Sequence, residues 1–531
     1  MTRQEREAEY RKRGYWRPET LARRRATITS RGPGGVAILE GGRSLSYGEI
    51  DALVERLAGH LASLGVGPGD VVSWQLPNWW EAVVVHHAAL RLGAVPNPLN
   101  AIFRARELRF VLPQARPKVL IAAARMRRFD SGALAVELAG TIDSIGTVIT
   151  ARGRVAGATE LEFLLSEPSP PPPPAPENPA ADALLLYTSG STGDPKGVRH
   201  SHETLLYEME SLVPIHDLSP EDRYLGGAPV SHIAGLVYGL LMPFALGTST
   251  TFIERWEPAR ALEAIERDRA TFQTGTPTFL QTLAEDPAAG RRGLSSFRLF
   301  STGGASIPVD AIIEAGRRLG CVVKRAYGST EVPTLTGSTL DDSENVRLRT
   351  DGRVIRPGEI RIVRRDGVEA DREEEGEILA RSPEVFRGYA NPSLDAGAFD
   401  GDGWVHTGDL GLLDEEKRLR VTGRLQDVII RGGENISARE VEDLLQAHSA
   451  ISEVAVVGLP DDRLGEKACA VVVLRKGFHL TFEEMAAFLQ AREIAMQKIP
   501  ERLEFRTRLP RTASGKVQKA ALREALRADT T

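Results

Sequence analysis

The sequence predicts an α/β protein with a large N-terminal part and a small α+β part at its C-terminus. The chain has 531 residues, too many for a single core of ordinary size. Short apolar runs rich in β-branched residues alternate with amphipathic helical patterns, which is typical of layered sheets and helices. After about residue 427 this alternating pattern is replaced by a short succession of helix, strand, strand and helix. We therefore expect a large domain over residues 1–423, a connection over 424–427 and a small domain over 428–531.

The clearest helix is predicted over residues 46–65. Ser46 and Glu49 make a capping box, and apolar residues recur behind them at helical spacing. Gly65 supplies a stop signal. The apolar positions are Ile50, Leu53, Leu57, Leu61 and Leu64.

Buried strands are predicted wherever β-branched and apolar residues cluster in short runs. The small domain is predicted to hold two helices with two strands between them, and a proline-rich tract is expected to be an extended surface connection. The predicted strands of the large domain are 83–85, 119–121, 184–187, 297–300 and 321–323. The small-domain helices are 438–447 and 482–490, its strands are 453–457 and 468–474, and the proline-rich tract is 168–179.

Composition and charge exclude several classes of function. The 67 basic and 72 acidic residues give a net charge of −5, which offers no general footprint for nucleic acid. The most apolar stretch, residues 233–248, is too short to span a bilayer. The charged N-terminus lacks the apolar core of a secretory signal, and Cys321 and Cys469 stand in apolar surroundings typical of inert, reduced thiols. We expect a cytoplasmic protein without a membrane span.

The strongest functional signal follows the apolar run 184–186. Residues 187–197 read YTSGSTGDPKG, in which glycines let the backbone curl while hydroxyls and exposed N–H groups donate to phosphate oxygens. This is not a Walker A loop, because no stretch fits G-x-x-x-x-G-K-[ST] and Lys516 is followed by Val517. The candidate phosphate-binding residues are Thr188, Ser189, Gly190, Ser191, Thr192, Gly193 and Lys196.

The same eleven residues resemble the signature of the adenylate-forming superfamily, which includes acyl-CoA synthetases, aryl-acid ligases, nonribosomal adenylation domains and luciferases. Further segments resemble the family's motifs in the family's order, from about residue 45 to residue 519. The motifs are closest in style to those of acyl- and aryl-CoA ligases. The resemblance implies a large domain with a mobile small domain, ATP and Mg²⁺ as cofactors, and coenzyme A as a co-substrate.

Residues 301–305 and 327–331 resemble two nucleotide-binding motifs of the family. There, the counterpart of Tyr327 stacks on adenine, that of Thr330 contacts the α-phosphate, and that of Glu331 holds Mg²⁺; an aromatic face, a hydroxyl and a carboxylate suit these roles. The resemblance thus gives Glu331 as metal ligand, and it counts Thr188 and Glu331 among the catalytic residues. The nucleotide-binding candidates in this region are Gly303, Gly304, Ala305, Ala326, Tyr327, Gly328, Ser329 and Thr330.

Two later segments resemble the ribose-binding motif and the catalytic loop. Residues 404–409 (WVHTGD) end in Asp409, whose counterpart binds both ribose hydroxyls, and Arg424 is expected to add a contact to ribose or phosphate. Residues 509–516 (LPRTASGK) resemble the loop that delivers a lysine. Because a carboxylate attacking a phosphate brings two anions together, an ammonium group stabilises that step, and Lys516 is the predicted catalytic and ATP-contacting lysine. Relatives commonly carry Asp or Lys at the domain pivot, where this chain has Gln426.

The substrate segment 228–236 (APVSHIAGL) lacks the carboxylate of amino-acid-activating relatives, and Ile233 replaces the Asn of dihydroxybenzoate-activating ones. A small, apolar lining favours an alicyclic, simple aromatic or medium-chain acid. His232 is expected to wall the carboxylate end and is counted among the catalytic residues; a core histidine with its hydrogen bonds satisfied is the alternative interpretation. Residues 428–437 (VIIRGGENIS) resemble the loop of the pantetheine tunnel, which implies a tunnel for the thiol. The predicted tunnel residues are Gly432, Gly433 and Glu434.

Several alternatives remain open from the sequence. A carrier-protein thiol would use the same tunnel as coenzyme A, so a stand-alone ligase that adenylates an aryl or acyl acid and loads a carrier protein is the second hypothesis. A non-catalytic nucleotide sensor would be expected to lack Lys516, Glu331 or Asp409, all of which are present. A homodimer is also left open.

Overall fold

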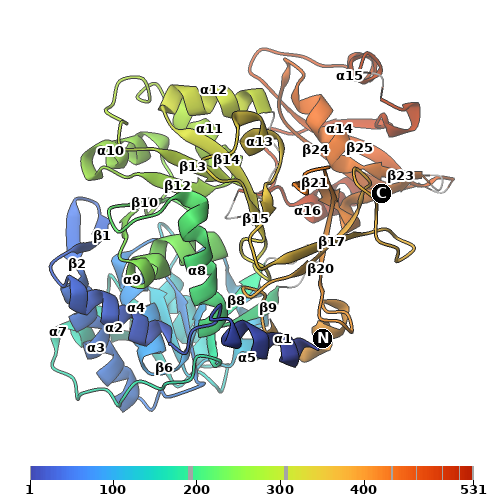
Figure 1. Ribbon diagram of the computed structural model, residues 1–531. Helices are drawn as coiled ribbons and strands as arrows, with labels where there is room; N and C mark the ends of the chain where they lie inside the picture. Colours follow the sequence, from blue (N-terminus) through green and yellow to red (C-terminus); the bar gives the residue numbers. More distant parts are fainter. Residues whose placement is uncertain are drawn as a thin grey trace.

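The computed structural model describes residues 2–188, 195–303, 309–431, 434–461, 463–492, 494–512 and 515–528. Five sheets are found in the described chain, four of them in the part that precedes residue 425. Figure 1 shows the fifth sheet, in orange and red, set to one side of the rest of the molecule. The described chain contains no helix long and apolar enough to cross a membrane.

A nine-stranded sheet forms the framework for the site. Its order is β16-β15-β14-β13-β12-β10-β11-β1-β2, and the strands from β14 to β1 are parallel. The carboxyl ends of these strands therefore meet along one edge. The strands are β1 (Val36–Glu40), β2 (Arg43–Ser46), β10 (Arg223–Gly226), β11 (Ser249–Phe252), β12 (Phe272–Gly275), β13 (Leu299–Thr302), β14 (Val322–Tyr327), β15 (Thr336–Gly337) and β16 (Arg353–Val354).

Three further sheets complete the large domain. A parallel sheet of order β4-β3-β5-β6-β7 shares one buried apolar cluster with the nine-stranded sheet. Two smaller sheets, β19-β9-β8 and β17-β18-β20-β21, are antiparallel. The strands are β3 (Val71–Gln75), β4 (Val95–Pro98), β5 (Val119–Ala123), β6 (Thr147–Ala151), β7 (Thr159–Glu160), β8 (Asp182–Thr188), β9 (Lys196–Ser201), β17 (Glu359–Val363), β18 (Gly376–Arg381), β19 (Gly388–Tyr389), β20 (Val405–Leu413) and β21 (Leu419–Arg424).

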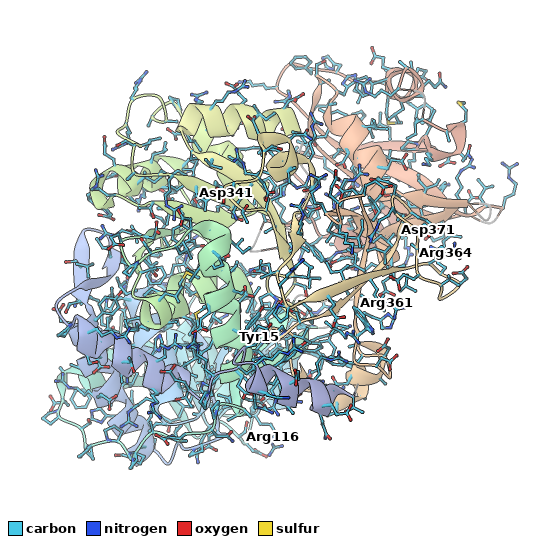
Figure 2. All side chains as sticks on the ribbon, in the orientation of Figure 1. Tyr15, Arg116, Asp341, Arg361, Arg364 and Asp371 are labelled. Atoms are coloured by element: carbon cyan, nitrogen blue, oxygen red, sulfur yellow. The ribbon has the colours of Figure 1, made fainter. Side chains whose placement is uncertain are left out.

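The helices of the large domain cover these sheets. The N-terminal helices run along the outside of the domain, and Tyr15, which follows the first helix, lies against α8, where its ring contacts that of Tyr207 (Figure 2). The helices are α1 (Arg3–Lys12), α2 (Leu21–Arg31), α3 (Tyr47–Ser63), α4 (Trp80–Arg91), α5 (Ala105–Ala115), α6 (Ser131–Ala139), α7 (Leu161–Ser166), α8 (His202–His216), η1 (Gly235–Leu241), α9 (Met242–Leu246), α10 (Pro258–Asp268), α11 (Pro277–Glu285), α12 (Val309–Leu319), α13 (Glu344–Arg349) and η2 (Pro392–Gly397).

The small domain has a sheet of order β23-β22-β25-β24, with β26 paired to β25, and its own apolar clusters. A short helix, η3 (Leu425–Asp427), leads into it. Its strands are β22 (Val428–Arg431), β23 (Glu434–Ser437), β24 (Ile451–Asp461), β25 (Gly465–Leu474) and β26 (Arg502–Phe505). Its helices are α14 (Ala438–Gln446), α15 (Phe482–Gln490), η4 (Met496–Lys498) and α16 (Lys519–Ala528).

Most of the predicted elements are confirmed. The helix predicted over 46–65 is α3, with the capping box of Ser46 and Glu49 formed and Gly65 in the left-handed region at φ 80°. The strands predicted at 119–121 and 184–187 lie within β5 and β8, and those at 297–300 and 321–323 overlap β13 and β14. All four predicted elements of the small domain are present, with strands longer than expected.

The strand predicted over 83–85 is wrong. These three valines lie in α4 and are fully buried. A helix that is apolar on every side loses the 3.6-residue signal, so a short run of valines in it resembles a buried strand.

The proline-rich tract 168–179 has no helix or strand, as expected, but it packs closely on the large domain. Pro173 accepts a hydrogen bond from Arg91 through its carbonyl (2.7 Å). A Cβ on Gly59 of α3 would lie 2.1 Å from the carbonyl oxygen of Pro170, so only glycine allows this close approach.

Burial keeps six histidines neutral in the folded protein, because it lowers their pKa well below the ordinary value. An unfolded chain takes up these protons below about pH 6.5 and the folded chain does not, so the free energy of unfolding falls as the pH falls. Glu208 and Glu384 act in the opposite sense, since burial raises their pKa to about 7 and about 8 and the folded chain keeps their protons. The six histidines are His86, His87, His200, His202, His216 and His232.

We expect the histidines to dominate, with the free energy of unfolding falling by about 4 to 5 kcal/mol per pH unit between about pH 6 and pH 5. Urea denaturation at about pH 7, 6 and 5 measures this slope. His86→Phe should reduce this slope by the contribution of about one proton. Both ring nitrogens of His86 are buried without a hydrogen-bond partner among the described residues. An equal slope in that variant would show that His86 takes up its proton in the folded state.

Candidate functional site

Several of the predicted site residues that the structure describes lie at or near the carboxyl edge of the nine-stranded sheet, where β12, β13 and β14 end. This edge is the usual place for ligands in open parallel sheets. At the end of β13, a Cβ on Gly303 would lie 2.5 Å from the carbonyl oxygen of Ala326 on β14. Glycine at 303 therefore lets the two strand ends approach closely.

The segment after β14 forms a tight turn. Ser329 accepts hydrogen bonds at its Oγ from the N–H groups of Glu331 and Val332, both 3.2 Å long. A Cβ on Gly328 would lie 1.9 Å from the carbonyl oxygen of Pro333. The ring of His200, on β9, donates from Nε2 to the carbonyl of Thr330 (2.8 Å), which fixes Thr330 beside β9.

Asp409 joins the nucleotide-binding segments to the domain boundary. Tyr327 donates a hydrogen bond from its hydroxyl to Oδ2 of Asp409 (2.9 Å), and Arg424 forms an ion pair with Oδ1 (2.9 Å). Asp409 and Arg424 face each other in the pairing of β20 with β21. Burial and the nearby Asp409 raise the pKa of Tyr327 well above its ordinary value. The carboxylate is held rigidly and retains lone pairs for ribose hydroxyls.

Lys196 and Glu331 approach the same point from β9 and from the turn. Tyr389 of β19 links them, because its hydroxyl donates to Oε1 of Glu331 (3.0 Å) and Nζ of Lys196 lies 5.5 Å from its ring centroid. Thr188 and Lys196 are paired residues of β8 and β9. A single carboxylate with a free oxygen suits Mg²⁺, which keeps waters and substrate phosphates as its other ligands.

Lys516 reaches this large-domain site from the small domain. Its loop is closed by hydrogen bonds in both directions between Thr512 and Lys516, from Thr512 N–H to the Lys516 carbonyl (2.7 Å) and from Lys516 N–H to Thr512 Oγ1 (3.1 Å). Gly515 has φ 85°, and a Cβ there would lie 3.3 Å from Oγ1 of Thr276 in the large domain. The loop therefore contacts the end of β12.

The charges of the site act directly on Lys516. Burial lowers the pKa of Lys516 to about 8, with Arg424 lowering it further while Asp409 and Glu331 raise it. The structure thus brings together four charged residues from three separate parts of the sequence. Such a lysine is positioned to neutralise anions that meet between Asp409 and Glu331.

His232 lies on the same side of the site. Burial lowers its pKa to about 4, and the positive charge of Lys516 acts in the same direction. Its ring accepts at Nδ1 from the N–H of Ala234 (3.4 Å). The imidazole is therefore neutral, so it can wall a carboxylate or donate one hydrogen bond to it, but it adds no charge.

The predicted hinge residue Gln426 lies in η3 and is exposed. Its carbonyl accepts a hydrogen bond from Arg523 of α16 (3.4 Å). Asp427 pairs with Arg523 (2.7 Å), while Arg424 pairs with Asp409. The ion pairs of this connection therefore change from the large domain, at Arg424, to the small domain, at Asp427. The pivot at Gln426 stays a prediction.

Several predicted residues lie outside the part of the chain that the structure describes. These are Ser189, Gly190, Ser191, Thr192, Gly193, Gly304, Ala305, Gly432 and Gly433. Glu434 opens β23, where its backbone pairs with that of Arg431.

Sequence reasoning missed Tyr389 and His200. Tyr389 belongs to a strand of two residues, too short for any periodic signal. His200 lies in β9 beside the phosphate-binding string, and its role depends on a long-range contact with Thr330. No local pattern could have predicted either contact.

Comparison with known proteins now identifies the family. A model of the AMP-binding enzyme family matches residues 24–390, and a model of the AMP-binding enzyme C-terminal domain matches residues 440–516. The chain belongs to this adenylate-forming family. The predicted resemblance and the predicted fold class are confirmed.

The relatives include ligases of both kinds that the sequence left open: CoA ligases and ligases that load a carrier protein. It is 33% identical over 531 residues to the medium-chain fatty-acid–CoA ligase of Escherichia coli (strain K12), covering 98% of this chain and 93% of the relative. It is 33% identical over 526 residues to the salicyl-AMP ligase / salicyl-S-ArCP synthetase of Mycobacterium tuberculosis, covering 98% and 93%.

Solved structures of similar proteins include one protein with and without ATP. ATP-bound MatB from Rhodopseudomonas palustris has a TM-score of 0.87 at 29% identity, covering 96% of this chain and all of MatB. The apo form of MatB gives a TM-score of 0.75, with 30% identity and coverage of 96% and 100%. The AMP-binding enzyme described here therefore superposes better on the form that holds ATP.

Proposed function

We propose that this enzyme joins an alicyclic, aromatic or medium-chain carboxylic acid to coenzyme A in two steps. In the first, a carboxylate oxygen of the acid bonds to the α-phosphorus of ATP while the bond to pyrophosphate breaks, which leaves an acyl-adenylate. In the second, the thiol sulfur bonds to the acyl carbonyl carbon, AMP leaves with its electron pair, and the thiol proton is released.

The placement of Lys516 is the observation that supports the first step. Its ammonium group feels the charges of Asp409, Glu331 and Arg424, and we infer that the nucleotide and the acid carboxylate would meet beside it. The attack brings two anions together, and a cation held in place stabilises the charge that develops between them. Neutral His232 would border the acid carboxylate without competing for that charge.

The nucleotide would be held by residues of the large domain. Asp409, held by Tyr327 and Arg424, would accept hydrogen bonds from the ribose hydroxyls. The hydroxyl of Thr330 and the ammonium of Lys196 would serve the phosphates. Glu331 would hold Mg²⁺, which supplies charge neutralisation for the phosphate oxygens when bound.

Coenzyme A is the acceptor that we favour, because several relatives are named as CoA ligases, among them the medium-chain fatty-acid–CoA ligase. A carrier-protein thiol is the second candidate, favoured by the relative described as a salicyl-S-ArCP synthetase. The segment with Gly432, Gly433 and Glu434 would border the thiol tunnel in either case.

Mass spectrometry of products from a panel of acids tests the proposal. Incubations with ATP and Mg²⁺ should give an acyl-adenylate, and addition of coenzyme A should convert it to an acyl-CoA with release of AMP. An acyl-adenylate that persists with coenzyme A and disappears only with a carrier protein would replace the first candidate by the second. Absence of adenylate with every acid would contradict both.

Asp409→Ala should weaken ATP binding by about tenfold to a hundredfold, since hydrogen bonds to ribose are made equally in the ground and transition states. Calorimetry with ATP measures this. Asp402→Ala, at an exposed turn before β20, is the matched control and should bind ATP normally. Unchanged ATP affinity in Asp409→Ala would reject the ribose assignment.

A further inference from the structure

Hydrogen bonds from the sheet β19-β9-β8 and its flank hold the turn that carries Glu331. Tyr389 of β19 donates from its hydroxyl to Oε1 of Glu331 (3.0 Å). Phe386, just before β19, donates its N–H to the carbonyl of Glu331 (2.8 Å). His200 of β9 donates from Nε2 to the carbonyl of Thr330 (2.8 Å). The side chain and the backbone of the proposed metal ligand are therefore fixed by separate contacts.

The carboxylate of Glu331 has one bonded and one open oxygen. Within the described part of the chain, Oε1 accepts from Tyr389 alone, and Oε2 has neither a hydrogen bond nor an ion pair. The last torsion of a glutamate side chain has only broad energy wells, so a carboxylate without a partner would turn easily. The hydroxyl of Tyr389 removes this freedom and leaves Oε2 open for another ligand.

Tyr389 is itself held in one position. Its N–H donates to Oδ1 of Asp395 (2.7 Å), and a Cβ on the preceding Gly388, at φ 132°, would lie 2.6 Å from Oδ2 of the same carboxylate. The ring of Tyr389 packs edge-on against the buried ring of Phe386, with centroids 4.9 Å apart. Only 6% of Tyr389 is exposed. A donor that is locked by packing in this way holds its partner in one orientation.

The ring of Tyr389 has a second neighbour in Lys196, whose Nζ lies 5.5 Å from the ring centroid. A cation at this distance is attracted by the face of an aromatic ring. Lys196 and Glu331 form no direct ion pair with each other in the described residues. Tyr389 thus contacts the carboxylate through its hydroxyl and the ammonium group through its ring, and both charged groups stay available to a ligand.

We propose that Tyr389 is a positioning residue for Glu331, and that its hydroxyl presents the open oxygen Oε2 to the Mg²⁺ that accompanies ATP. This rests on the proposed function, in which Glu331 holds that metal. Carboxylates that bind metals are oriented by hydrogen bonds from surrounding side chains, and loss of such a bond typically weakens the metal site by about tenfold to a hundredfold. Mg²⁺ demands near-ideal octahedral geometry, so it is sensitive to the direction of a carboxylate oxygen.

Tyr389→Phe tests the hydroxyl and keeps the ring beside Lys196. Calorimetry without any acid measures the dissociation constant of ATP, once in excess EDTA and once in excess Mg²⁺. The ratio of the first constant to the second reports how much the metal favours binding. This ratio should be about tenfold lower in Tyr389→Phe than in the wild-type enzyme, while the affinity for ATP in EDTA should stay near that of the wild type. Damage to the fold would instead weaken ATP binding under both conditions.

Glu331→Gln shows whether Tyr389 acts through Glu331. This variant should lower the ratio at least as much as Tyr389→Phe does. In the double variant, removal of the hydroxyl should have no further effect, because the group that it orients has already been changed. A further fall of about tenfold in the double variant would show that Tyr389 acts independently of Glu331 and would overturn the proposal.

Tyr207→Phe is the matched control. Tyr207 is also 6% exposed, and its hydroxyl donates a hydrogen bond of 3.0 Å to the carbonyl of Arg356, a contact without any predicted site residue. This variant should keep the wild-type ratio. A wild-type ratio in Tyr389→Phe, or an equal fall in Tyr207→Phe, would overturn this proposal and leave the proposed function standing. Failure of the wild-type enzyme to bind ATP under either condition would overturn both.

Discussion

Lys516→Ala should lower the rate of adenylate formation by about two to three orders of magnitude, while the protein stays folded. Removing one preorganised group that stabilises developing charge has an effect of this size. Lys516 lies in a loop whose closing hydrogen bonds use its backbone and Thr512, not its side chain, so the loop should survive the substitution. Acid-dependent release of pyrophosphate measures the first step.

The second step supplies the control for this variant. A chemically prepared acyl-adenylate should still give acyl-CoA in Lys516→Ala, because the lysine is needed only where the carboxylate meets the phosphate. Lys519→Ala is the matched variant, since Lys519 lies three residues away and pairs with Glu442 and Asp427 inside the small domain and its connection. Near-normal release of pyrophosphate by Lys516→Ala would reject the catalytic assignment.

The same lysine predicts a pH dependence. Its pKa is lowered to about 8, chiefly by burial, and only its charged form stabilises the transition state. The value of kcat/KM for pyrophosphate release reports groups of the free enzyme, so it should fall as the pH rises above about 8. A profile that stays flat to about pH 10 would show that Lys516 is charged throughout or is not required.

The sequence predicted the parts of the fold and the site that depend on local patterns. The capping box of Ser46 and Glu49 and the two helices of the small domain are each set by neighbours in the chain. Glu331, Asp409 and Lys516 were predicted by resemblance, but their proximity is a result of the fold. The charges acting on Lys516 provide the link between them.

The features that the sequence could not predict depend on long-range contacts. In α8, Glu208 resembles any polar residue of a helix, and its burial follows from the contact with Thr334, which is distant in the chain. Tyr389 contacts Glu331 through a strand of two residues. Val83, Val84 and Val85 were misjudged because complete burial removes the polar face that distinguishes a helix from a strand.

Replacing Gln426 by Pro should separate the two steps. The observed arrangement places Lys516 in the site, and Gln426 lies in a turn of 3₁₀-helix, where φ is about −50 to −70°. Proline fixes φ near −65°, so it is compatible with this arrangement and opposes a change of backbone dihedrals at residue 426. We therefore expect adenylate formation near the wild-type rate and loss of thioester formation.

Gln426→Ala is the control that isolates the backbone effect. Gln426 accepts a hydrogen bond from Arg523 through its carbonyl, and its side chain is exposed, so alanine should leave both steps near wild type. Pyrophosphate release and thioester yield are measured on the same preparation. If residue 426 were an ordinary surface position, proline would be tolerated or would lower both steps together through destabilisation, and parallel changes would reject the pivot. Loss of the second step alone would mean that the small domain must turn about this residue before a thiol can reach the adenylate.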